Sequence, residues 1–145
     1  MRFWDTSALL KLYAFEPDAA YFLNLVANDA RPLLTADIAR EEMLCALYRK
    51  ELSGDVKPGE ARVLFNRFLE DERNGRIIVI PNGQDVLAEA ERLVKRCYAQ
   101  TPPLTVRSLD VIHVASALVS KADAVVATDA RLRDAAGVMG LNVLP

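Results

Sequence analysis

The chain has 145 residues, of which 52% are apolar and 26% are charged, a balance that is typical of a globular protein and excludes a disordered one. We therefore expect one domain, residues 1–145, long enough to bury a hydrophobic core. The 18 Lys and Arg against 20 Asp and Glu give a formal charge of −2. This argues against binding of nucleic acid through bulk positive charge, but leaves open an enzyme that holds nucleic acid through a few Arg and Lys around a metal.

The first part of the chain predicts two short strands separated by helices. Residues 2–5 form an apolar run that ends on Asp5 and leads at once into a helical segment from Thr6. Residues 16–18 end that segment, and Asp18 can cap a second helix. The apolar positions of this second helix are Tyr21, Phe22, Leu25 and Val26. Residues 31–32 end the second helix, because the residue before a proline disfavours the helical region, and residues 33–36 form the second strand.

Two helices and the clearest strand follow in the middle of the chain. Asp37 opens a long helix that reaches about residue 53, where Gly54 supplies the stop. Another helix starts at residues 57–59 and has its apolar positions between residues 63 and 69. Residues 76–81 are a continuous, mostly β-branched run, which is typical of a strand covered on both faces of its sheet.

The last part of the chain repeats the alternation of helix and strand. Residues 85 to about 100 have helical periodicity, and residues 101–105 form a loop because consecutive prolines cannot continue a helix. Ser108 caps an almost wholly apolar helix that runs from residue 109 to about 119. A strand over residues 124–128 ends at Asp129, a helix covers residues 132–139, and residues 141–144 form a last short strand.

Short buried strands that alternate with helices predict an α/β fold. We expect a three-layer α/β/α sandwich with a mainly parallel central sheet of four to five strands. Ligands of open α/β sheets bind beyond the carboxyl ends of the strands. This rule singles out Asp5 and Asp129, because each lies at or just past the end of a predicted strand.

The start of the chain and its cysteines favour a cytoplasmic location. Residues 1–5 do not resemble a signal peptide, and no stretch approaches the roughly 18 uninterrupted apolar residues of a membrane span. Cys45 and Cys97 lie far apart inside apolar helical patterns, so we expect reduced core residues rather than a disulfide. Two cysteines and a single histidine without ligand spacing argue against a Cys/His zinc site.

Four acidic residues stand at positions where neutral residues would be easier to bury. Asp5 and Asp129 end strands, Glu42 lies near the start of the long third helix, and Asp110 lies in the first turn of the apolar helix. Taken singly, Asp5 and Asp129 could be ordinary helix caps, and Asp110 could serve the helix dipole. Helical period does not choose between Glu42 and its neighbour Glu41.

The four carboxylates as a set point to a cation. Brought together, they would repel one another and raise each other's pKa unless a positive charge neutralised them. Ligation by oxygen alone suits Mg²⁺ or Mn²⁺, which bind a few carboxylates and complete their shell with water and phosphate. The sequence therefore predicts that Asp5, Glu42, Asp110 and Asp129 hold Mg²⁺ or Mn²⁺ and carry catalysis.

The four acids stand in four short segments: residues 5–9 (DTSAL), 42–47 (EMLCAL), 109–115 (LDVIHVA) and 127–132 (ATDARL). These segments resemble the acidic motifs of PIN domains, and more narrowly those of the VapC toxins of type II toxin–antitoxin pairs. Each motif alone is weak, but the ordered set is specific and covers essentially the whole chain. The second motif aligns Glu42 rather than Glu41. The resemblance implies a PIN-like fold and a metal-dependent endoribonuclease that acts on structured RNA, forms a homodimer and is held inactive by a cognate antitoxin.

The resemblance and the chemistry together assign roles to these residues. Asp5, Asp110 and Asp129 would hold a cation that activates water and polarises a phosphoryl oxygen, and Glu42 would bind a second metal or orient its waters. By resemblance, the products carry a 5′-phosphate and a 3′-hydroxyl.

Neighbouring polar residues keep two interpretations. Thr6, Ser7 and Thr128 either hydrogen-bond the site or serve as local caps. His113, one turn beyond Asp110, is better interpreted as a core histidine than as a ligand, because Mg²⁺ prefers oxygen. The side chains of Lys11, Arg107 and Arg131 could meet RNA phosphates, although surface solvation is the default interpretation.

Three other functions compete with this hypothesis. A phosphotransfer receiver needs a phosphoacceptor Asp at the end of the third strand, where this chain has residues 80–82 (IPN). A phosphatase of the Asp-x-Asp type is disfavoured because Thr6 and Ser7 follow Asp5. A non-catalytic PIN-like module that only binds RNA or a protein remains as the alternative, and the presence of all four acids argues against it.

Overall fold

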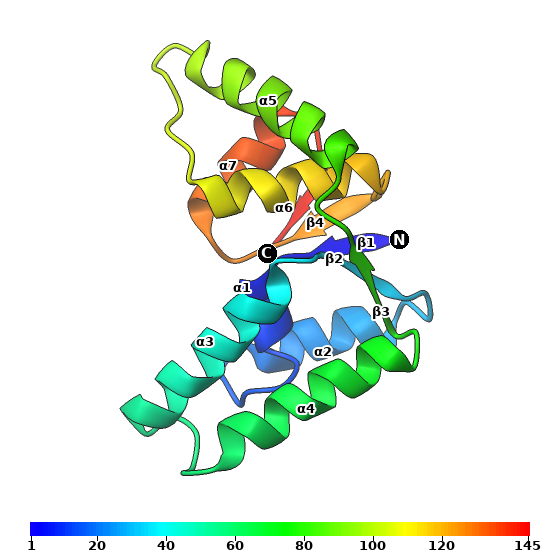
Figure 1. The fold of residues 1–145 in the computed structure, drawn as a ribbon, viewed down its shortest axis with the longest axis vertical. Coiled ribbons are helices and arrows are strands. Elements are labelled where there is room, and N and C mark those ends of the chain that lie inside the picture. The colour runs from blue at the N-terminus through cyan, green and yellow to red at the C-terminus, as the bar shows by residue number, and fades with distance from the viewer.

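The computed structural model describes residues 1–145 as a five-stranded sheet between two layers of helices (Figure 1). The elements follow one another as β1 (Arg2–Trp4), α1 (Thr6–Leu10), α2 (Ala19–Ala27), β2 (Leu33–Ala36), α3 (Ala39–Ser53), α4 (Glu60–Arg73), β3 (Ile77–Ile80), α5 (Gln84–Tyr98), α6 (Ser108–Val119), β4 (Ala124–Val126), α7 (Ala130–Val138) and β5 (Val143–Leu144). The predicted α/β class and the parallel sheet are confirmed.

The order of the strands places the switch point of the sheet between β1 and β4. The sheet has the order β3-β2-β1-β4-β5, and every neighbouring pair is parallel. The chain therefore builds outward from β1 to β3 and then returns to the other side of β1 for β4 and β5. The carboxyl ends of β1 and β4 lie at this switch point, which is where open α/β sheets bind their ligands.

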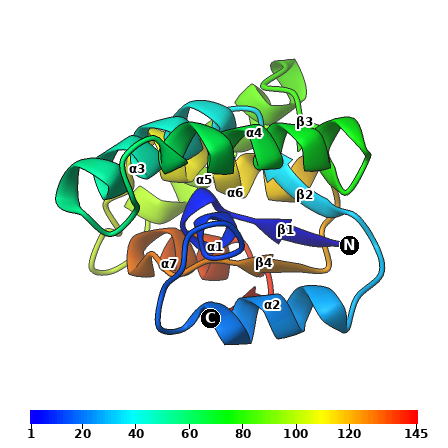
Figure 2. The same ribbon diagram turned by 90° about the horizontal axis from the view of Figure 1, so that it is seen from below.

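Alternating residues of the central strands pack in two separate cores, one on each face of the sheet. Trp4 and Val126 belong to the core that α1 to α4 cover. Phe3 and Val125 belong to the core that α5 to α7 cover. Figure 1 shows these two helical layers on opposite sides of the sheet, and Figure 2 shows the same arrangement from below, from the side of α1 to α4.

One predicted helix cap, Asp18, and one predicted helix start, Asp37, are wrong, and both side chains pair with basic side chains instead. Asp18 makes no capping hydrogen bond to α2, and its Oδ1 accepts from Lys11 Nζ at 2.8 Å. Asp37 does not open α3, and its Oδ1 accepts from Arg40 Nη1 at 2.6 Å. Gly54 does stop α3, as predicted, because it adopts the left-handed conformation with φ 86° that glycine tolerates best.

Other corrections concern burial and a further cap. β3 is not covered on both faces: it is an edge strand, and Ile78 is 39% exposed. Cys97 lies in the core, whereas Cys45 is exposed. Tyr21 is also exposed, although Phe22 beside it is buried. Ser108 is the first residue of α6 rather than its cap and makes no capping hydrogen bond. None of the helices is both long and apolar enough to cross a membrane.

Candidate active site

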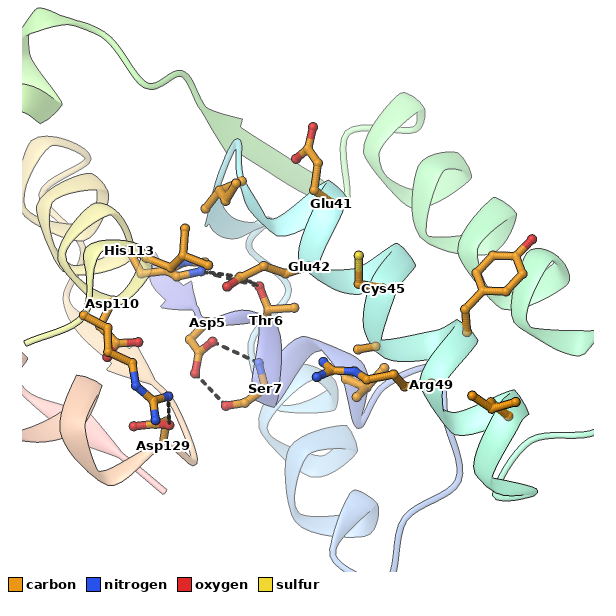
Figure 3. A pocket seen from close by; sticks show the side chains of 17 residues that line it. Asp5, Thr6, Ser7, Glu41, Glu42, Cys45, Arg49, Asp110, His113 and Asp129 are labelled. Carbon is orange, nitrogen blue, oxygen red and sulfur yellow. Dashed lines mark hydrogen bonds and ion pairs between the residues drawn. The ribbon is translucent and has the colours of Figure 1, made fainter.

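A cavity of about 970 Å³ opens at the carboxyl ends of β1 and β4. The four predicted carboxylates, Asp5, Glu42, Asp110 and Asp129, all line it. They come from four different places in the fold: the end of β1, the first turn of α3, the first turn of α6 and the start of α7. Figure 3 shows these side chains gathered on one side of the cavity.

Asp5 is the buried member of the set, with 5% of its surface exposed. It caps α1, and its Oδ1 accepts from the backbone amide of Ser7 at 2.9 Å, while its Oδ2 accepts from Ser7 Oγ at 2.5 Å. Burial raises the pKa of Asp5, and the nearby charge of Glu42 adds to this effect. The charge of His113 and the bonds from Ser7 oppose the rise without cancelling it. A cation beside Asp5 would relieve the cost of keeping it ionised.

Ser7 also connects the ends of the two central strands. The hydroxyl of Thr128 donates to Ser7 Oγ at 2.8 Å, and the backbone amide of Thr128 donates to the same atom at 3.1 Å. Ser7 and Thr128 therefore fit both of the predicted roles, as local caps and as hydrogen-bond partners of the site. Ser7 belongs to the capping of α1 and, together with Thr128, holds the Asp5 carboxylate in place.

Glu42 is held on the other side of the cavity by two side chains. Its Oε2 lies 2.7 Å from His113 Nε2 and also accepts a short hydrogen bond from Thr6 Oγ1. Burial acts to raise the pKa of Glu42, but the hydrogen bond and charge of His113, with the bond from Thr6, hold the pKa below its usual value. Glu41 is exposed at the rim, and its side chain points away from Asp5 (Figure 3). The structure thus brings Glu42, and not Glu41, to the other acids.

Asp110 carries a buried oxygen, Oδ2, that has no hydrogen-bond partner. Burial raises the pKa of Asp110, and the charges of Asp129 and Asp5 raise it further, although Arg107 lowers it. An unpartnered carboxylate oxygen is costly to bury. A cation beside this oxygen would supply the missing partner.

Asp129 caps α7 with one carboxylate oxygen, and its other oxygen faces the guanidinium of Arg107. Its Oδ1 accepts from the backbone amides of Arg131 and Leu132, at 2.8 and 3.3 Å. Its Oδ2 lies 3.9 Å from Arg107 Nη1. The cap interpretation of Asp129 is confirmed, and it does not exclude a role in the cavity, because Oδ2 remains outside the cap.

The donor set fits a hard divalent cation. The four acids supply oxygen only, the pKa of both Asp5 and Asp110 is raised, and Asp110 Oδ2 has no partner. Oxygen ligands are those that Mg²⁺ and Mn²⁺ prefer, and either ion would lower the raised pKa values and give Asp110 Oδ2 a partner. At their present positions, no three His, Cys, Asp or Glu side chains of the chain stand close enough together to form a complete metal site.

The cationic residues near the motifs separate into two groups. Lys11 pairs with Glu16 and Asp18 and does not line the cavity, and Arg131 does not line it either. Arg107 does line it. His113 is 2% exposed, which confirms its interpretation as a core histidine. It also lines the cavity, where its Nε2 contacts Glu42.

Sequence reasoning missed Arg49, which lines the cavity opposite Asp110 (Figure 3). The signal was present: Arg49 lies seven residues after Glu42, a spacing that places both on one face of α3. By contrast, no residue of β3 lines the cavity, so the end of the third strand is not where the acids gather. This arrangement disfavours the receiver hypothesis further.

Comparisons with known proteins agree with this architecture. Among solved structures, the chain is similar to VapBC2 from Rickettsia felis bound to a DNA fragment from their promoter (14% identity, TM-score 0.70, covering 99% of this chain and 96% of that one). It is also similar to VapC20 from Mycobacterium tuberculosis, a Sarcin-Ricin loop cleaving toxin (16%, 0.70, 93% and 95%). A third similar structure is FitAcB from Neisseria gonorrhoeae (17%, 0.68, 100% and 97%). At these identities the likeness shows a shared fold.

No curated protein matches the sequence. The sequence profile of the PIN domain matches residues 2–138, which is nearly the whole chain and contains all four acids of the cavity. The chain belongs to the PIN domain family.

Proposed function

We propose that this chain is a metal-dependent endoribonuclease toxin that hydrolyses phosphodiester bonds of RNA and is neutralised by a cognate antitoxin. The observation that carries the proposal is the convergence of Asp5, Glu42, Asp110 and Asp129 on one cavity at the switch point of the sheet. Membership of the PIN domain family and similarity to a toxin that cleaves the Sarcin-Ricin loop support it.

The residues of the cavity divide the work of a phosphodiester hydrolase. Asp5, Asp110 and Asp129 would hold Mg²⁺ or Mn²⁺, and Glu42 would bind a second ion or orient water. When bound, the cation polarises a phosphoryl oxygen and lowers the pKa of water in the site. Ser7 fixes the orientation of Asp5. The expected products are a 5′-phosphate and a 3′-hydroxyl.

Two arginines are suited to receive the RNA backbone. Arg49 and Arg107 both line the cavity and are exposed, and Arg49 makes no ion pair. Guanidinium groups bind phosphates through paired hydrogen bonds. They would therefore hold phosphates next to the scissile bond, while the carboxylates hold the cation.

The proposal includes protein partners. Similarity to VapBC2, to FitAcB and to the toxin VapC20 supports the resemblance to toxin–antitoxin pairs. In this chain α3 exposes large apolar side chains four residues apart, at Leu44, Tyr48 and Leu52. An exposed apolar stripe of this kind is typical of a surface that a protein covers. We expect an antitoxin and a second copy of the chain as partners, in the cytoplasm.

Cleavage of RNA by the purified protein tests the proposal. Antitoxin-free protein is incubated with total RNA and Mg²⁺ or Mn²⁺, beside Asp5→Asn, and the new 5′ ends are sequenced. We expect a few discrete cuts that require the metal, disappear with EDTA and are absent in the variant. Cuts that persist in EDTA or in Asp5→Asn would contradict the proposal.

A second candidate is a non-catalytic PIN-like module that binds RNA or a protein. One observation favours it: no three potential ligands stand close enough together for a complete metal site. Such a module would show neither metal-dependent cuts nor stabilisation by Mn²⁺. If the wild-type protein shows neither metal-dependent cuts nor stabilisation by Mn²⁺, the binding module becomes the better explanation.

A further inference from the structure

Two hydrogen bonds from different elements meet on the same oxygen of Glu42. His113 Nε2, from α6, lies 2.7 Å from Oε2, and Thr6 Oγ1, from α1, donates to Oε2 as well. Oε1 has no protein partner, and the Glu42 side chain is 24% exposed. In Figure 3 the three side chains meet above Asp5. One oxygen is therefore fixed to the protein, and the other is free toward the cavity.

We infer that His113 and Thr6 are positioning residues that clamp Oε2 of Glu42 and thereby present Oε1 to the metal or to its waters. This inference rests on the proposed function. It assigns a role to a histidine that does not itself bind the metal. It also explains why Glu42, whose helix lies on the opposite side of the sheet from α6, points toward the other acids.

The surroundings of His113 make it suitable for this role. The residue is 2% exposed, and its ring packs edge-on against Phe3 with the ring centroids 6.1 Å apart. An ionised carboxylate only accepts hydrogen bonds, so Nε2 carries the proton of the bond to Glu42. Nδ1 has no partner. The bond to Glu42 is therefore the only strong polar contact that the ring makes, apart from the 3.5 Å approach to Thr6 Oγ1.

The conformational freedom of the Glu42 side chain explains what is lost without the clamp. A glutamate side chain has several rotatable bonds, and fixing it costs conformational entropy. With Oε2 already bound by residues from α1 and α6, that cost is met during folding rather than during metal binding. Partners of this kind around a metal site typically contribute 10- to 100-fold in metal affinity or activity.

The test compares two amides at position 113. His113→Gln places an amide nitrogen close to where Nε2 lies, whereas the shorter side chain of His113→Asn does not reach Glu42. Ser116→Ala is the matched control, because Ser116 lies one turn further along α6, is buried and has no hydrogen-bond partner. The Mn²⁺ dissociation constant of each RNA-free protein is measured by calorimetry, together with its metal-free melting temperature and RNA cleavage.

We expect His113→Asn to weaken Mn²⁺ binding about 10- to 100-fold, and His113→Gln and Ser116→Ala to bind Mn²⁺ as the wild type does. In a Glu42→Gln background, His113→Asn should cause no further loss, because its effect acts through Glu42. If His113→Asn does not fold, the pair Thr6→Val and Thr6→Ser tests the same clamp, since only Ser keeps the hydroxyl.

Three results would overturn the inference. His113→Asn that melts earlier but binds Mn²⁺ like the wild type would show a packing role alone. An equal loss in the Glu42→Gln background would show that His113 does not act through Glu42. A wild-type protein that binds no Mn²⁺ would remove the proposed function as well, and this outcome is distinct from normal wild-type binding with unaffected variants.

Discussion

The hydroxyl of Thr128 donates to Ser7 Oγ across 2.8 Å and so joins two residues that are 121 positions apart in the chain. Ser7 in turn donates to Asp5 Oδ2 at 2.5 Å. The carboxyl ends of β1 and β4 are therefore linked by a short chain of hydrogen bonds that ends on a buried carboxylate. Removal of its middle member affects both strand ends at once.

Ser7→Ala should destabilise the protein and loosen Asp5. The variant loses the bond to a buried carboxylate and leaves Thr128 without its partner, and a hydrogen bond to a charged group is worth about 1.5–3 kcal/mol. The side-chain bond from Ser7 lowers the pKa of Asp5, so its loss should raise this pKa further, while the bond from the backbone amide of residue 7 remains. Urea unfolding at pH 8 measures the loss. Ser120→Ala, whose hydroxyl bonds only locally to the Ala117 carbonyl, is the control; equal losses in both variants would contradict the prediction.

Asp5→Asn should stabilise the metal-free protein at neutral pH. Burial raises the pKa of Asp5 above its ordinary value of 3.8, so between these two pKa values the folded state binds more protons than the unfolded state. The free energy of unfolding of the wild type therefore falls as pH rises through this window and stays reduced above it. A rise of one pKa unit corresponds to about 1.4 kcal/mol. Asn carries no charge and lacks this loss.

Unfolding in EDTA from pH 4 to pH 8 measures the effect. Asp110→Asn should behave like Asp5→Asn, because the pKa of Asp110 is raised as well. Asp123→Asn is the control with the opposite sign: the N-terminal amine and Arg31 lower the pKa of Asp123, so its removal should cost stability at neutral pH. A wild-type curve that runs parallel to that of Asp5→Asn at every pH would show that Asp5 is not strained by its surroundings.

Added Mn²⁺ should raise the melting temperature of the wild type. A ligand at 100 times its dissociation constant stabilises the folded state by about 2.7 kcal/mol, which for a domain of this size corresponds to roughly 5–10 °C. Asp5→Asn and Asp110→Asn should lose most of this response. Melting curves over a series of Mn²⁺ concentrations measure this rise, and a curve recorded in EDTA gives the melting temperature of the metal-free protein. An unchanged wild-type curve at millimolar Mn²⁺ would contradict the proposed site.

The fold class could be predicted because it follows from short-range patterns in the sequence. The apolar runs that end at Asp5 and Asp129 and the helices between them were enough to expect a parallel sheet and acids at its carboxyl edge. Boundaries failed where a side chain had a better partner than the backbone, as Asp37 has in Arg40. The edge position of β3 could not be predicted for another reason. Strand order depends on pairing between distant segments, and a run of β-branched residues does not determine it.

The sequence predicted which acids line the candidate site, but not the hydrogen bonds that join them to other side chains. The four acids could be chosen from strand ends, helix starts and the family motifs. The bond between His113 and Glu42 joins residues 71 positions apart and exists only after α3 and α6 have packed on the sheet. Arg49 was missed for a related reason. Its spacing from Glu42 was regular, but nothing local distinguished it from the other exposed arginines of the helices.

Arg49→Ala should weaken RNA binding while leaving the metal site intact. Arg49 lines the cavity without an ion-pair partner, so its guanidinium is free to meet a phosphate. We expect a higher KM for a cleaved RNA and a shallower dependence of binding on salt, by about 0.7 in the slope of log K against log salt for one lost contact to single-stranded RNA. The Mn²⁺ dissociation constant should not change. Arg67→Ala, an exposed arginine of α4 outside the cavity, is the matched control. If both variants raise KM equally, the arginines act through general charge, and Arg49 has no specific place at the scissile bond.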